Sequence, residues 1–71
     1  MIITEQQAQL LKRLLPGEAD ELLAADDAMA ILDVLDELYI TLLDDNDEPT
    51  DASRECERLR DHIHWNNFHV D

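Results

Sequence analysis

The sequence predicts a small all-α fold, a three-helix bundle of up-down-up topology, and three observations indicate it. The chain has 71 residues, the length of a single domain. It contains one Gly and two Pro, which suits helices and argues against an all-β fold with many tight turns. Its apolar residues recur at the three- and four-residue spacing of amphipathic helices. We predict one helical domain over residues 1–71.

The first helix is predicted over about residues 4–15. Thr4 and Gln7 have the spacing of a capping box, in which each side chain bonds the backbone N–H of the other residue. Pro16 and Gly17 end this helix. Residues 18–24, led by acids, are predicted to form one or two extra helical turns, either as a separate short helix or as the lead-in to the next helix.

The second helix is predicted over about residues 26–44, with Asp26 or Asp27 as its N-cap. Its apolar residues cover nearly half of the circumference, which suits a helix packed against two neighbours. The central stripe consists of Ala28, Ile31, Leu35, Leu38 and Leu42.

The third helix is predicted over about residues 51–66. Ala52, Cys56, Leu59 and Ile63 give it a narrow apolar stripe. Asn66 and Asn67 end it, because Asn tolerates the left-handed conformation of a C-cap. Short connections favour antiparallel packing of consecutive helices. The alternative is a helical hairpin that dimerises into a larger bundle.

The negative charge is confined to the middle of the chain. There are 18 Asp and Glu against 5 Lys and Arg, and residues 14–53 hold 13 of these acids and no base. Such a field repels nucleic acid and anionic lipid and attracts basic protein surfaces. The alternative is that the acid only keeps a small apolar protein soluble.

Several classes of function are disfavoured by composition. The single Cys56 excludes an internal disulfide, and no signal peptide or apolar run of about 20 residues is present. We therefore expect a cytoplasmic protein without a membrane partner, encoded by a small complete reading frame of a kind common in prophages and mobile elements. One Gly cannot build a phosphate loop, so we expect neither an enzyme nor a cofactor. Five bases cancelled by nearby acids cannot track a phosphate backbone, which argues against nucleic acid binding.

We expect no specific metal site. Residues 44–55 resemble an EF-hand calcium loop in spacing, with oxygen ligands at Asp44, Asn46, Glu48, Thr50 and Glu55. However, Pro49 occupies the position where that loop needs Gly, and Ala52 offers no ligand. The thiol and imidazole groups of Cys56, His62, His64 and His69 lack the paired spacing of a zinc site.

A secondary stripe on the second helix is a candidate binding surface. Met29, Asp33, Asp36 and Ile40 follow one another at helical spacing, away from the main apolar arc, and Glu37 lies beside them. Apolar anchors among carboxylates are typical of a protein contact with a polar rim. The alternative is that Met29 and Ile40 pack beneath the first helix or the turn at 18–24.

The acids Asp44, Asp45, Asp47 and Glu48 extend this candidate surface. Carboxylates are mildly unfavourable at a helix C-terminus, so their presence there suggests a function. In the specific form of a nucleic-acid-mimicking decoy, the acids would stand in rows spaced like phosphates. Asp26/Asp27, Asp33, Asp36/Glu37 and Asp44 recur about every seven to ten residues, roughly 10–15 Å along a helix.

Trp65 and Phe68 are the remaining candidates for partner contact. They either fold back over the core beyond a helix end at Asn66 or project outwards into an interface, where Trp is often a hot spot. The sequence thus predicts a small non-enzymatic protein-interaction module with a basic protein partner. The alternative is a structural or assembly protein that acts as a helical homo-oligomer, in the simplest case a homodimer.

Overall fold

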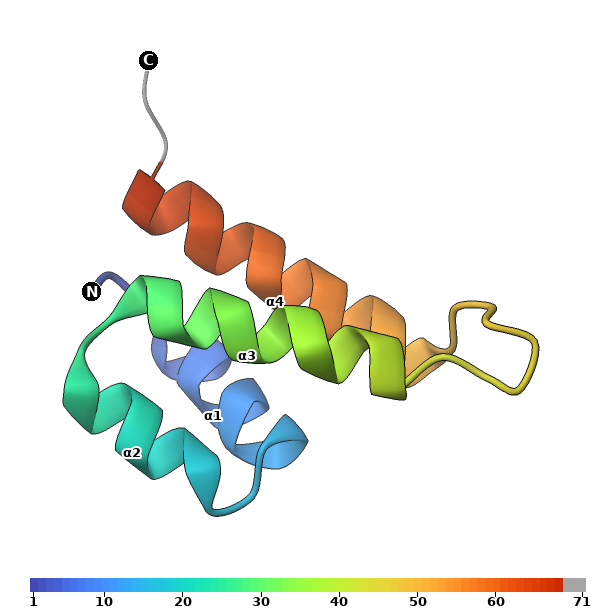
Figure 1. The fold of residues 1–71 in the computed structure, drawn as a ribbon. Coiled ribbons are helices and arrows are strands. Elements are labelled where there is room, and N and C mark those ends of the chain that lie inside the picture. Colours follow the sequence, from blue (N-terminus) through green and yellow to red (C-terminus); the bar gives the residue numbers. More distant parts are fainter. Residues whose placement is uncertain (69–71) are drawn as a thin grey trace.

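The computed structural model describes residues 1–68, which form four helices and no strand (Figure 1). These are α1 (Glu5–Leu14), α2 (Glu18–Ala25), α3 (Ala28–Thr41) and α4 (Asp51–Phe68). The predicted all-α helical bundle is confirmed. The count differs slightly, because the predicted turn at 18–24 is a separate helix of 8 residues.

The helices α3 and α4 form an antiparallel hairpin and pack along each other (Figure 1). The helix α1 packs against α2 and α4, so that α1 and α2 lie on one side of the hairpin. The smallest extent of the molecule is 19 Å, about two helix diameters. One side of the hairpin is consequently left uncovered.

All four helices contribute to one core. The buried apolar residues are Leu11, Leu15, Ala19, Ala28, Ile31, Leu32, Leu35, Cys56, Leu59 and Ile63. Burying a large side chain of this kind contributes about 1.5–3 kcal/mol. A single copy of the chain therefore builds a continuous core. None of the four helices is long and apolar enough to cross a bilayer.

The start of α1 is the predicted capping box. The Gln7 N–H donates to Thr4 Oγ1 and the Thr4 N–H donates to Gln7 Oε1, each at 3.1 Å. Gly17 precedes α2 with a φ of +88°, a conformation that costs a residue with a Cβ more than it costs Gly. This glycine lets the chain reverse directly after α1, so that residues 18–25 can form a helix of their own.

The helix α3 begins at its predicted cap but ends earlier than predicted. Asp27 is the N-cap, and its Oδ1 accepts from the Met29 N–H at 3.0 Å. The last helical residue is Thr41 rather than residue 44. The reason lies in Asp44, whose Oδ1 accepts from the N–H groups of Asn46 at 2.8 Å and Glu48 at 2.9 Å. These local bonds hold residues 44–48 in a turn.

The start of α4 is fixed by a reciprocal pair of hydrogen bonds. The Ser53 N–H donates to Thr50 Oγ1 at 3.1 Å, and the Thr50 N–H donates to Ser53 Oγ at 2.7 Å. This cap turns Ser53 inward, where it is fully buried, and leaves Ala52 exposed. The predicted position of Ala52 on the apolar stripe is therefore wrong, whereas Cys56, Leu59 and Ile63 are buried as predicted.

The predicted end of α4 at Asn66 is also wrong, since the helix runs through Asn66 and Asn67 to Phe68. The side chain of Asn67 makes contacts that local sequence does not reveal. Its Nδ2 donates to the carbonyl oxygens of Ile63 at 2.8 Å and Ile2 at 2.9 Å, and its Oδ1 accepts from the Ile2 N–H at 2.6 Å. Asn67 therefore holds the N-terminal segment against α4 and does not end the helix.

Candidate partner-binding face

The predicted stripe on α3 is exposed. Met29 and Ile40 show 53% and 69% of their surface, so the alternative in which they pack beneath other helices is wrong. We call this surface the outer face of α3, and it consists of Met29, Asp33, Asp36, Glu37 and Ile40. Residues of the opposite side of the helix, among them Ile31 and Leu35, are completely buried.

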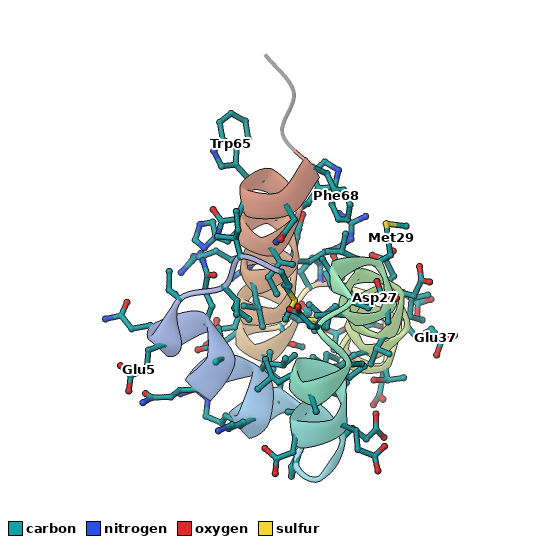
Figure 2. All side chains as sticks on the ribbon, turned by 90° about the vertical axis from the view of Figure 1, so that its left-hand side faces the viewer. Glu5, Asp27, Met29, Glu37, Trp65 and Phe68 are labelled. Carbon is teal, nitrogen blue, oxygen red and sulfur yellow. The ribbon has the colours of Figure 1, made fainter. Side chains whose placement is uncertain are left out.

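The packing of the bundle explains why this face is open. The helix α3 packs on α4 through one side, and α1 and α2 lie on the same side of the hairpin. Figure 2 shows Met29 and Glu37 on the side of α3 that points away from α1, whereas Glu5 lies at the opposite edge of the molecule. The outer face is thus a continuous helical surface with an apolar side chain toward each end.

The outer face of α3 carries excess negative charge. Within residues 1–68, Asp33 and Glu37 form no ion pair, and the Arg60 Nε donates to Asp36 Oδ1 from α4. The Arg60 guanidinium therefore offsets one carboxylate and leaves two exposed ones unopposed. In a hydrated setting such a surface attracts cations and basic protein groups over roughly one Debye length, about 8 Å at physiological salt.

The acidic loop projects beyond the helices (Figure 1) and does not prolong α3. Asp44, Asp45, Asp47 and Glu48 are all exposed. The Asp44 carboxylate is used within the loop, as described above, and Asp47 takes a φ of +61°. Among the residues that the structure describes, no three His, Cys, Asp or Glu side chains are grouped so that they could hold a metal ion.

Trp65 and Phe68 do not fold back over the core, so that interpretation is wrong. Because α4 continues to Phe68, both side chains project from the helix, with 61% and 38% of their surface exposed. Figure 2 shows them pointing to different sides, Phe68 toward the side of α3 that carries Met29. The ring of Phe68 lies 5.8 Å from that of His64. The two aromatic residues are therefore not one patch.

A groove between α3 and α4 adjoins the outer face and was not predicted. It has a volume of about 240 Å³ and is lined by Leu35, Asp36, Tyr39, Glu57, Arg60 and Asp61. Only Asp36 among these was a predicted site residue. The others could not be found from sequence, because their convergence depends on which rows of α3 and α4 meet. The periodic pattern of each helix alone does not specify this.

The remaining candidate ligands are dispersed. Cys56 is buried, and its Sγ donates to the Leu35 carbonyl oxygen at 3.4 Å. Burial raises the pKa of the Cys56 thiol, and the nearby carboxylates of Asp36 and Glu57 raise it further. A buried thiol with a raised pKa is a poor nucleophile and a poor metal ligand. His62 and His64 are exposed on α4, and His69 lies outside the described residues.

Comparison with protein-family models, curated proteins and solved structures found no match to this chain.

Proposed function

We propose that the protein is a small non-enzymatic interaction module that binds a basic protein surface through the outer face of α3. One observation carries the proposal: Met29 and Ile40 are exposed among carboxylates, two of which no cation opposes within residues 1–68. Exposed apolar anchors within a polar rim are the usual anatomy of a protein interface.

The dimensions of this face fit such a contact. Met29 and Ile40 are 11 positions apart on a straight helix, which corresponds to roughly 16 Å. That distance is about three turns of a partner helix laid alongside α3. An apolar side chain at each end of the contact would fix the register, and the carboxylates between them would select a basic partner.

Charge also argues against a second copy as the occupant of this face. Two copies would bring the same carboxylates together, and like-charge contact at an interface costs free energy. The field of a chain with a net charge of −13 instead speeds association with a basic surface. We therefore assign the face to a different protein.

Affinity capture with matched variants tests the proposal. The wild-type protein is presented to an extract of its host cells beside Glu37→Lys and Ile40→Ser on the outer face, and Glu5→Lys and Ile2→Ser elsewhere. Each pair makes the same chemical change at an exposed residue. We expect basic proteins that the wild type and the Glu5 and Ile2 variants retain and that the outer-face variants lose.

The affinity for a captured protein is then measured directly. We expect Glu37→Lys and Ile40→Ser each to weaken binding by about tenfold, the size of a moderate interface residue, and added salt to weaken it further. Equal retention by all four variants would contradict the proposal, as would a set of captured proteins that are acidic.

The decoy is the more specific form of this proposal. Support comes from the exposed acids along α3, although Met29 and Ile40 interrupt the row and Asp44 lies beyond the helix end. A decoy would occupy a surface that otherwise binds nucleic acid. We expect the wild type, but not Glu37→Lys, to displace a labelled DNA duplex from the captured partner. A partner that holds both ligands at once argues for protein binding without mimicry.

Homo-oligomerisation is the second candidate function, and the exposure of Ile2, Trp65 and Phe68 at the end of α4 favours it. Light scattering across a concentration series measures the molar mass. A mass that rises with concentration supports self-association, and a constant monomer mass up to millimolar concentration removes it.

A further inference from the structure

We propose that the groove between α3 and α4 receives an arginine side chain of the basic partner. The inference rests on the proposed function and adds the chemistry of one contact to it. The groove adjoins the outer face through Asp36, which belongs to both. A partner lying along α3 would therefore reach the groove without a change in the fold.

The charge of the groove favours a cation. Three carboxylates, those of Asp36, Glu57 and Asp61, face the single guanidinium of Arg60. Arg60 is shared, since its Nε donates to Asp36 and its Nη1 lies 3.7 Å from Asp61 Oδ1. Glu57 forms no ion pair within residues 1–68. The groove thus has capacity for a second positive group.

The negative potential of the groove also acts on the core behind it. The carboxylates of Asp36 and Glu57 both contribute to the raised pKa of the Cys56 thiol, which lies in the core beneath. Opposite charge on the groove would offset this field.

The apolar lining distinguishes a guanidinium from an ammonium. Leu35 is completely buried behind the groove, so the accessible apolar wall is the ring of Tyr39, which is half-buried. A guanidinium is planar, weakly hydrated and stacks on aromatic rings, while its donors pair with carboxylates in a fixed geometry. A lysine ammonium is more strongly hydrated and gains less from such walls. The groove therefore fits arginine better than lysine.

Arg60 makes within the protein the kind of guanidinium–carboxylate contact that we propose for the partner's side chain. Its own guanidinium already pairs with Asp36, and the side chain remains 36% exposed at the groove. An incoming arginine would share or replace this pairing. Removing Arg60 should then free a carboxylate for the ligand and tighten binding.

Peptide titration followed by NMR tests the proposal. Capped hexa-arginine and hexa-lysine peptides are added to the full chain, and the ring signals of Tyr39, the single tyrosine, report on the groove. We expect hexa-arginine to shift these signals saturably. The dissociation constant of hexa-lysine should be at least about threefold higher. The ring of Phe68, also a single residue of its type, reports for comparison on the C-terminal end of α4.

Matched variants separate the groove from the general field. Glu57→Gln is compared with Glu5→Gln, and Arg60→Gln with Arg54→Gln, since each pair removes one charge of the same sign. We expect Glu57→Gln to weaken hexa-arginine binding about fivefold and Glu5→Gln less than twofold. Arg60→Gln should tighten binding more than Arg54→Gln does. Asp61→Asn gives a second groove variant in case Arg60→Gln unfolds, which far-UV circular dichroism reports.

Two results would overturn the groove assignment. One is binding of both peptides with the same affinity and the same response to Glu57→Gln and Glu5→Gln, which indicates the diffuse field alone. The other is a peptide that shifts outer-face signals but not those of Tyr39. Neither result bears on the proposed function, because that is decided by partner capture with Glu37→Lys and Ile40→Ser, residues that do not line the groove.

Discussion

The hydroxyl of Thr50 donates a 2.6 Å hydrogen bond to the carbonyl oxygen of Leu42, eight residues earlier in the chain. Leu42 follows the last residue of α3, and Thr50 is the cap of α4. The bond therefore joins both ends of the acidic loop. Thr50 Oγ1 also accepts from the Ser53 N–H, so one hydroxyl caps the start of α4 and holds the end of the segment that follows α3.

Replacing Thr50 by Val removes this hydroxyl with little change of shape. We expect the free energy of unfolding to fall by about 1–2 kcal/mol, the usual loss for an N-cap. Urea unfolding measures it. Thr41→Val is the control, because the Thr41 hydroxyl bonds only the exposed Leu38 carbonyl of its own helix, and it should cost less than about 0.5 kcal/mol. Equal losses would mean that neither the cap nor the bond to Leu42 contributes to stability.

Asp44 and Asp45 are adjacent acids with different expected contributions. Asp44→Ala removes the acceptor of two backbone N–H groups, and we expect a loss of about 1–2 kcal/mol. Asp45→Ala removes an exposed carboxylate that has no ion pair within residues 1–68, and should change stability by less than about 0.5 kcal/mol. Hydrogen exchange at the Glu48 amide is expected to accelerate only in Asp44→Ala. Acceleration in both variants would contradict this assignment.

Leu35 and Ile40 test which side of α3 is core. Leu35 is completely buried and Ile40 is largely exposed. We expect Leu35→Ala to lower the free energy of unfolding by about 2–5 kcal/mol and Ile40→Ala by less than about 0.5 kcal/mol. Denaturant titration of both variants measures the difference. A large loss in Ile40→Ala would place the outer face in the core and remove it as a binding surface.

Cys56 is predicted to be unreactive in the native protein, because its thiol is buried and its pKa is raised above the ordinary value of 9.0. A thiol reagent should react only after denaturation. Rapid modification of the native protein would contradict the buried position.

The raised pKa of Cys56 also predicts a loss of stability at alkaline pH. Above pH 9.0 the unfolded chain loses the thiol proton while the folded chain still holds it. The free energy of unfolding therefore falls as the pH rises. Stability is unaffected below this pH and declines until the folded-state pKa is reached. Cys56→Ala should remove this part of the decline. All other ionisable groups are common to the two proteins, so the difference between the two curves isolates the thiol.

The elements of the fold that depend on local sequence were predicted well. The Thr4–Gln7 capping box and the Asp27 cap lie within one turn of the residues they bond, so spacing alone identifies them. The core stripes of α3 and α4 follow from helical periodicity. For residues 18–24 the sequence left open a separate short helix or a lead-in to the next helix, and the separate helix α2 is the one that forms, after a chain reversal at the left-handed Gly17.

What could not be predicted depends on contacts between distant segments. Asn67 was interpreted as a helix stop from its usual local role, but its side chain instead binds the backbone of Ile2. The bond from Thr50 to the Leu42 carbonyl oxygen, which closes the acidic loop, also joins residues on opposite sides of that loop. The groove likewise requires the relative positions of Tyr39 and Glu57 on two helices. Each of these is set by packing, which one sequence does not specify.

The molecule is only 19 Å thick, because one side of the hairpin is uncovered. Binding of a partner on that side should raise the melting temperature of the protein. A helix laid on the open side of the hairpin would make α3 and α4 the middle layer of three. Since such a partner binds the folded chain and not the unfolded one, its binding free energy adds to that of folding by mass action. At a partner concentration of about 100 times Kd this linkage is worth about 2.7 kcal/mol. A label-free thermal shift can therefore rank candidate partners.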